Sequence, residues 1–251
     1  DDLETIRVLN KIADIYISRD NDGDAQKSLE INLKVYAVRK EKLGENHVDF
    51  AWICFDLAFN YMELPGRKNT LLALNYINRA IDVARLQMGD FHPDFARFLK
   101  ERTNIYGALG GQANLEQAIK DDRQVLKIFK KYRGKKHTSV ATAYVSWASD
   151  LIDLKTKAGT LKAIKCYKKA LIINAEYYGA ESEEVRNCLG QLSIAYSNLD
   201  DMGNVKLGIE LGEQALQLRR KHLGLIHRDV KNSLRNLARM YLDYDSRENI
   251  L

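Results

Sequence analysis

The feature that most constrains the fold of this chain is a glycine that returns every 45 residues. Five short segments read Gly-x-x-His or Gly-x-x-Ser, and their glycines are Gly44, Gly89, Gly134, Gly179 and Gly224. Self-similarity at a period of about 20 to 50 residues is typical of repeat architectures, in which each unit buries its apolar face against its neighbours. The sequence therefore predicts an array of stacked units.

Alignment on this period predicts two amphipathic helices per unit. The first helix follows the His and carries a small residue with an aromatic three positions later, as in Ala58 and Tyr61. The second helix carries two small residues seven positions apart, as in Ala73 and Ala80. Residues at these spacings share one face of a helix, so each set marks an apolar seam. The small side chains let a neighbouring helix approach closely.

The ends of the helices carry their own signals. Four short polar residues stand just before the second helix and are expected to cap it: Asp24, Asn69, Asn114 and Asn204. Each repeated Gly is expected to end that helix in the left-handed α conformation. The connection between the two helices of a unit is expected to be long, as in the segment 62–68.

The array is predicted to be one domain over residues 1–251. Its units are 2–46, 47–91, 92–136, 137–181 and 182–226, and a closing helix spans 227–242, which makes eleven helices. Only Pro65 and Pro93 occur, and no Pro/Gly/Ser-rich linker divides the chain. We expect two-thirds to three-quarters of the residues to be helical, with no strand.

These columns resemble the tetratricopeptide repeat (TPR). Leu57-Ala58-x-x-Tyr61 followed by Ala73 and Ala80 shows the pattern, and the junction from Gly89 to Ala96 is similar to the kinesin light chain subclass. The resemblance covers nearly the whole chain and implies an all-α, right-handed superhelical solenoid of antiparallel helix pairs. It also implies a non-enzymatic scaffold that binds a peptide or helix of another protein in a concave groove.

The resemblance further implies which residues line that groove, because the family uses fixed positions of the first helix. The candidates are Trp52, Phe55, Phe59, Arg97, Lys100, Asn104, Asn187, Asn232, Arg235 and Arg239. Three aromatics beside two cations suit an apolar anchor flanked by acidic residues. The alternative is that Trp52 packs under the preceding unit and only holds the array together.

No catalytic, cofactor or metal motif is apparent. Walker A, HExxH and GxSxG patterns are absent, so we expect neither an enzyme nor a cofactor. Four of the five histidines share one repeat column, which indicates a role in the turn rather than a metal site. Cys54 and Cys188 stand in packing columns and are expected to be buried and inert, while Cys166 is less defined.

Arg102 breaks the pattern of the third unit. It occupies a column where other units have Leu57, Trp147 and Leu192. A buried charge needs a partner, and Asp121 and Asp122 are the candidates.

Charge and composition bear on the partner. The net charge of +5 is mild, and the basic runs near Lys130 and Arg220 fall at helix ends, where cations are stabilised. Nucleic acid is therefore not the expected partner, although an acidic lipid or nucleic acid remains a third hypothesis. No apolar run is long enough to span a membrane, and the few cysteines favour a cytoplasmic location.

The chain begins with Asp1 rather than Met, which suggests a piece of a longer protein. The competing function is therefore a sensor or regulatory array of a larger enzyme, such as an ATPase or protease switch. In that case the partner is another domain of the same chain.

Overall fold

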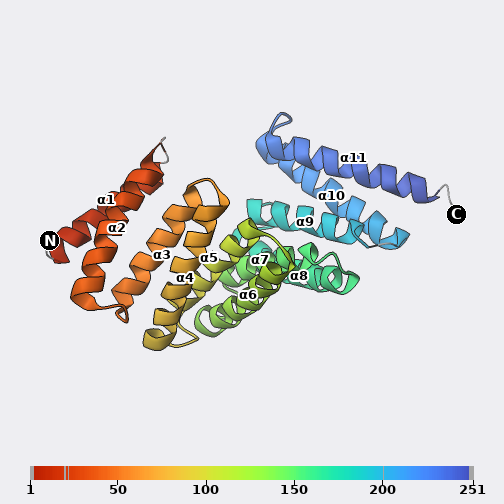
Figure 1. The fold of residues 1–251 in the computed structure, drawn as a ribbon. Helices are drawn as coiled ribbons and strands as arrows, with labels where there is room; N and C mark the ends of the chain where they lie inside the picture. The colour runs from red at the N-terminus through yellow and green to blue at the C-terminus, as the bar shows by residue number, and fades with distance from the viewer. Residues whose placement is uncertain (1–2, 20, 22, 200, 249–251) are drawn as a thin grey trace. The chain divides into compact units, whose positions relative to one another are not determined.

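The computed structural model describes residues 3–19, 21, 23–199 and 201–248, of which 86% are helical. This part of the chain contains α-helices and no strand, and the helices follow one another in chain order (Figure 1). The helices are α1 (Leu3–Arg19), α2 (Asp24–Leu43), α3 (Val48–Glu63), α4 (Arg67–Met88), α5 (Pro93–Leu109), α6 (Gln112–Arg133), α7 (Thr138–Asp153), α8 (Lys157–Tyr178), α9 (Glu183–Ser197), α10 (Met202–Leu223) and α11 (Arg228–Glu248). The predicted all-helical repeat fold is confirmed.

Helix content is higher than the sequence prediction because the connections within each unit are short. Of the segment 62–68, only Leu64, Pro65 and Gly66 lie outside α3 and α4. The additional residues lengthen the second helices, which have 20 residues in α2 and 22 in α4, α6, α8 and α10. The final helix, α11, also runs past the predicted end at 242.

The chain divides into two compact units, and the boundary lies within α6. Unit 1 is Asp1–Ile128 and unit 2 is Phe129–Leu251. In unit 1, α1 to α5 pack consecutively, and α3 also contacts α5. In unit 2, α7 to α11 pack consecutively, and α9 also contacts α11. The first helices α3 and α5 are therefore neighbours in unit 1, as are α9 and α11 in unit 2.

The small-residue columns are positions of close helix approach, as the sequence predicts. Ala73, Ala118 and Ala163 are buried on the second helices. At the equivalent Gly208, a Cβ atom would lie 2.8 Å from the carbonyl oxygen of Ser193, so only glycine fits there without displacement. The predicted seam thus forms in both units.

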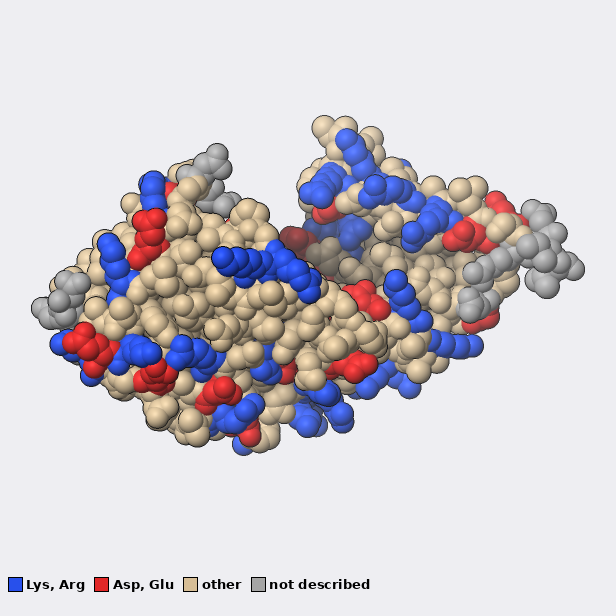
Figure 2. Space-filling view, viewed as in Figure 1, with Lys and Arg blue, Asp and Glu red and all other residues tan. Residues whose placement is uncertain are grey.

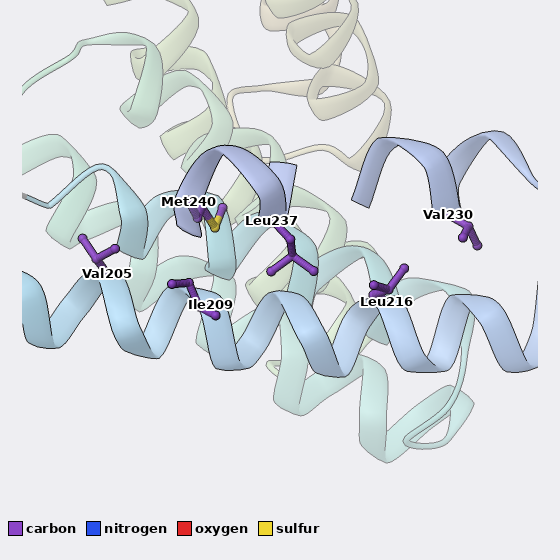
Figure 3. Close-up of a cluster of buried hydrophobic side chains, with 6 residues drawn as sticks. All are labelled: Val205, Ile209, Leu216, Val230, Leu237 and Met240. Atoms are coloured by element: carbon purple, nitrogen blue, oxygen red, sulfur yellow. The ribbon is translucent and has the colours of Figure 1, made fainter. Parts of the chain in front are cut away.

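An apolar cluster joins α10 to α11 and shows how neighbouring helices hold each other (Figure 3). The cluster consists of Val205, Ile209, Leu216, Val230, Leu237 and Met240. Burial of one such side chain contributes about 1.5–3 kcal/mol. Leu234 and Tyr241 border the same face of α11 and are 40% and 42% exposed. The hydroxyl of Tyr241 donates to the carboxylate of Glu213 in α10.

The repeated glycines adopt a conformation that differs from the predicted left-handed α cap. Their φ values lie between 78° and 91°. Their ψ values are extended, for example 164° at Gly44 and 169° at Gly89. This region of conformational space is almost confined to glycine, because a Cβ atom clashes with the backbone there. The requirement for glycine is therefore stricter than a left-handed α cap would impose.

The histidine column caps the first helices. Nδ1 of His47, His92, His137 and His227 accepts a hydrogen bond from the backbone N–H two residues later, over 3.1–3.2 Å. Ser182 replaces His in the fourth junction, and its Oγ accepts from the N–H of Val185. The predicted turn role of the histidines is confirmed.

The predicted caps of the second helices were misplaced: Asn69, Asn114 and Asn204 lie in the third position of their helices, and Asp24 is the first residue of α2. The side chains of Asn69 and Asn114 lie inside the first turn and donate to the carbonyl oxygens of Pro65 and Gly110. In α8 the cap is Thr156, whose Oγ1 accepts from the N–H of Gly159. The side chains of Asn69 and Asn114 are short and polar because they bond to a carbonyl oxygen four residues earlier. They do not cap the helix from the position before it.

Arg102 finds the partner that the sequence suggested. Its Nε and Nη2 atoms donate to the two carboxylate oxygens of Asp121 over 2.7 and 2.8 Å, and Nη1 donates to Asn78. The two side chains of the ion pair are only 18% and 9% exposed. A bidentate pair of this kind satisfies the charge of Arg102 at a position where the other repeats have apolar residues.

The cysteines and the hydropathy of the helices complete the fold. Cys54, Cys166 and Cys188 are free thiols and buried, and burial raises the pKa of Cys54 to about 12. None of the described helices is long and apolar enough to cross a membrane.

Candidate functional site

The predicted site residues fall into both units, and each group is described on its own. Trp52, Phe55, Phe59, Arg97, Lys100 and Asn104 belong to unit 1. Asn187, Asn232, Arg235 and Arg239 belong to unit 2.

In unit 1 an aromatic cluster forms between α3 and α5. The ring centroids of Trp52 and Phe55 are 5.7 Å apart, and Phe98 lies 4.9 Å from Trp52 and 5.3 Å from Phe55. We call Trp52, Phe55 and Phe98 the aromatic cluster. Phe98 is fully buried, while Trp52 and Phe55 are half-buried. The cluster thus has a buried floor and an accessible upper surface.

Arg97 places a positive charge on this surface. Its guanidinium carbon lies 4.8 Å from the centroid of the Trp52 ring, within the range of a cation–π interaction. Lys100 is half-buried one turn further along α5. The structure therefore brings together the aromatic and cationic residues of the prediction. It adds Phe98, a buried residue that is not among the predicted site residues.

Two other predicted residues of unit 1 lie outside the aromatic cluster. Phe59 is half-buried one turn beyond Phe55 on α3. Asn104 is exposed, and its side-chain amide donates to the carboxylate of Glu101 over 3.1 Å.

A carboxylate with a perturbed pKa stands on the same helix as the aromatic cluster. Burial, reinforced by the carboxylate of Asp14, raises the pKa of Asp56 to about 6. The side-chain amide of Asn10 donates to Asp56 over 3.2 Å and opposes the rise, as do the charges of Arg39 and Arg97. Asp56 is not among the predicted site residues.

Unit 2 contains a groove of about 560 Å³. First helices α7, α9 and α11 supply most of its lining, and α8 and α10 supply the rest. The predicted residues Asn187 and Asn232 line it, together with Gln191, Ser233 and Asn236. Arg235 and Arg239 are exposed on α11 and lie outside the lining, although Arg235 donates to the side-chain oxygen of Asn232.

Arg219 of α10 enters this groove from the second helix. Its Nη1 atom donates to Oγ of Ser233 over 2.5 Å, and Nη2 donates to Oδ1 of Asn187 over 3.1 Å. A Cβ atom at Gly190 would lie 3.2 Å from Nη2, so the absence of a side chain there gives the guanidinium its room. Arg219 is not among the predicted site residues, because those all lie on first helices. The available signal was Gly190 in a column that elsewhere holds Phe55 or Lys100.

Further basic residues recur along α11. Arg228, Lys231, Arg235 and Arg239 are exposed and stand three or four residues apart, and Figure 2 shows basic side chains along this helix. Such charges raise the local concentration of acidic ligands and speed their association. Among the described residues, no three His, Cys, Asp or Glu side chains are placed to hold a metal ion.

Similar proteins are found by comparison of structures but not by comparison of sequences. No protein-family model and no curated protein sequence matches the chain. Two crystal structures of a Podosopora anserina kinesin light chain-like protein with nearly identical TPR-like repeats are similar, each with a TM-score of 0.71. One is 19% identical and the other 18%, and the matches cover 86% and 87% of this chain and 95% and 97% of those chains.

A third similar structure is BtubC (BKLC) from P. vanneervenii, with a TM-score of 0.65 and 18% identity. That match covers 90% of this chain and 85% of the other. The chain therefore has a TPR-like repeat fold, similar to kinesin light chain-like structures.

Proposed function

We propose that this chain is a protein-interaction scaffold whose first-helix surface captures a peptide or short helix of a partner. In unit 1 the ligand presents an apolar anchor to the aromatic cluster and acidic residues to Arg97 and Lys100. The observation that carries this proposal is the accessible surface of Trp52 and Phe55 over buried Phe98, with Arg97 stacked on the indole ring.

This arrangement has the composition of an interaction hot spot. Aromatic anchors on a rigid, packed floor contribute most of the free energy of binding at protein interfaces. Trp52 packs against Phe98 of the following first helix, so its orientation is fixed before a ligand arrives. Charges at the rim contribute more to the rate of association and to specificity than to affinity. TPR-like repeats serve as interaction scaffolds in general, which supports the same class of function.

Panning of a random peptide library displayed on phage against the purified chain tests this function. We expect enriched peptides to share an apolar residue flanked by Asp or Glu. Trp52→Ala should weaken the selected peptides by about 2 kcal/mol, the usual magnitude for a hot-spot aromatic. Lys100→Glu should mainly slow association and reduce its dependence on salt.

Matched variants separate binding from folding. Lys68→Glu makes the same charge change at an exposed position of α4 and should leave the association rate nearly unchanged. Binding of Trp52→Ala is measured well below its melting temperature, beside a thermal denaturation curve. If Trp52→Ala melts much earlier yet binds the peptides with unchanged affinity in the cold, the proposal is wrong and Trp52 only supports the fold.

A further inference from the structure

The turn between α10 and α11 exposes two aliphatic side chains to solvent. We call this four-residue turn, Gly224 to His227, the α10–α11 joint. Its two central residues, Leu225 and Ile226, are 71% and 86% exposed. Exposure of aliphatic surface to water is unfavourable, so an exposed pair of this kind is a candidate contact surface.

The other joints of the array have no aliphatic pair at these two positions. The equivalent residues are Glu45-Asn46, Asp90-Phe91, Lys135-Lys136 and Ala180-Glu181. The glycine that begins the joint nevertheless has a similar φ, with 82° at Gly134, 91° at Gly179 and 78° at Gly224. The turn therefore forms with charged residues as well, and the fold does not require Leu225 and Ile226.

Cations flank the aliphatic pair on both sides. The segment 219–231 contains five Lys and Arg residues, and Asp229 is its one acidic residue. Arg220, Arg228 and Lys231 are exposed, and none of them forms an ion pair with any residue that the structure describes. Basic side chains lie beside this joint, which is at the top of the view in Figures 1 and 2.

The acidic groups at this end of unit 2 leave those three cations available. Glu181 pairs with Lys221 over 2.6 Å and with His222 over 2.9 Å. Asp229 is half-buried at the start of α11, where a carboxylate is stabilised by the helix dipole. The exposed part of the joint thus presents aliphatic side chains surrounded by positive charge.

We propose that Leu225 and Ile226 enter the surface of a bilayer rich in anionic lipid, while Arg220, Arg228 and Lys231 contact the headgroups. Peripheral proteins bind membranes by this combination of shallow apolar insertion and attraction to anionic lipid. Backbone polar groups cannot enter hydrocarbon unpaired, so the turn itself lies among the headgroups. This inference concerns a different partner and a different surface from the proposed peptide binding, and it does not depend on it.

A lipid surface fits the joint better than an acidic protein does. Stable protein interfaces bury about 800 Å² on each partner over a broad, closely packed surface. Here two highly exposed side chains stand on a four-residue turn, and neither lines the groove of unit 2. A bilayer closes around a narrow projection, whereas a protein needs a pocket of matching shape.

Co-sedimentation of the chain with lipid vesicles tests the inference. The vesicles contain phosphatidylcholine alone or equal parts of phosphatidylcholine and phosphatidylserine, and we expect strong binding to the mixed vesicles only. Leu225→Ser with Ile226→Ser should weaken this binding about tenfold or more, as the loss of two inserted side chains implies. Leu242→Ser removes a leucine of α11 that is 70% exposed and should leave binding unchanged.

The contribution of charge is measured with a matched pair of variants. Lys231→Gln should weaken binding to the mixed vesicles about fivefold, the usual effect of one cation at an anionic membrane surface. Lys68→Gln makes the same change at an exposed position of α4 and should have little effect.

A dye at the joint reports insertion directly. Ile226→Cys provides an exposed thiol for an environment-sensitive maleimide, while the buried Cys54, Cys166 and Cys188, whose pKa values are raised by burial, should stay unlabelled. We expect the emission to shift to the blue with mixed vesicles and to stay constant with soluble polyglutamate. The same dye on Leu242→Cys should not respond to either.

Unchanged binding of the serine double variant would overturn the inference, as would a dye at position 226 that does not respond to mixed vesicles. Absence of binding to the mixed vesicles would overturn it as well. If labelled polyglutamate binds the chain as tightly as the mixed vesicles do, the surface is a site for acidic proteins and the lipid assignment is wrong. None of these outcomes affects the aromatic cluster of unit 1, which is tested with peptides.

Discussion

At the residue scale, a single acceptor atom begins four of the first helices. Each Nδ1 must be free of a proton to accept the backbone N–H, so the tautomer that carries its proton on Nε2 is fixed by the fold. Ser182 does the same with a hydroxyl oxygen. The column therefore selects an acceptor at a set distance from the backbone, not an imidazole as such.

Replacement of His137 tests this interpretation. His137→Ala removes the acceptor for the N–H of Ser139 and should lower the free energy of unfolding by about 1 kcal/mol, the usual value of a lost N-cap. His137→Ser should retain most of the stability, because serine already caps α9 from this column. Urea denaturation compares the two variants, and equal losses would contradict the capping role.

The buried ion pair of Arg102 leads to a non-additive prediction. Arg102→Leu leaves the carboxylate of Asp121 buried without its partner and should cost about 3 kcal/mol. The double variant Arg102→Leu, Asp121→Leu should recover most of that loss, since Leu192 and Leu211 occupy these two positions in the fifth repeat. A double-mutant cycle by chemical denaturation measures the coupling, and simple additivity would refute the account.

Asp56 gives the chain a pH dependence of known sign. Its pKa is about 6 in the folded protein and near 3.8 in the unfolded chain, so the folded state binds the proton more tightly between these values. Its contribution to stability is complete below about pH 4 and is lost as pH rises through 6. Asp56→Asn should therefore stabilise the protein at pH 7.5, on the order of 1 kcal/mol because Asp56 is partly solvated, and change little at pH 4. Thermal melting at both pH values checks this.

At the element scale, close approach between helices decides where glycine is required. Gly159 stands in the first turn of α8, and a Cβ atom there would lie 2.5 Å from the backbone oxygen of Leu151 in α7. Gly203 stands in the first turn of α10, where the nearest atom is a side-chain oxygen of Asp201 at 3.5 Å. Similar positions in the chain thus differ in their tolerance of a methyl group.

Alanine substitution distinguishes these two glycines. Gly203→Ala should stabilise the protein by about 0.5 kcal/mol, since alanine loses less backbone entropy in a helix. Gly159→Ala should destabilise it by about 2 kcal/mol, because backbone atoms of α7 must move apart. Opposite shifts of the urea midpoint are expected, and two stabilised variants would show that α7 and α8 separate easily.

The helices were predictable from sequence, while several of their ends were not. Apolar spacing and small residues at Ala73 and Ala80 define a helical face directly, because the periodicity of a helix is fixed. Asn69 was misplaced because an amide can either cap a helix or reach back from its third residue, and composition does not separate the two. Arg219 was missed because its reach depends on the empty space above Gly190, which is a property of the packed structure.

At the scale of the whole molecule, stability is distributed between neighbouring helices. Within α1 to α5 and within α7 to α11, each helix packs mainly on those next to it in the chain, so removal of an end should weaken its neighbour first. Deletion of residues 228–251 exposes Val205, Ile209 and Leu216 of α10. We expect hydrogen exchange to accelerate in α10 and α9 of this truncated chain and to remain unchanged in α1 to α4. Uniform acceleration would indicate a single cooperative unit instead.

The joint between repeats also bears on how such a gene can change. Backbone hydrogen bonds hold the turn from Gly44 to His47. The N–H of Gly44 donates to the carbonyl oxygen of Lys40, and the N–H of His47 donates to the carbonyl oxygen of Gly44. The same pair of hydrogen bonds recurs at Gly89 and Gly179, with a similar conformation of the glycine. Duplication or loss of a 45-residue segment between two glycines would create no new kind of joint. Gene rearrangement can therefore lengthen or shorten the array in whole units, whereas a one-residue insertion within a helix would shift every seam after it.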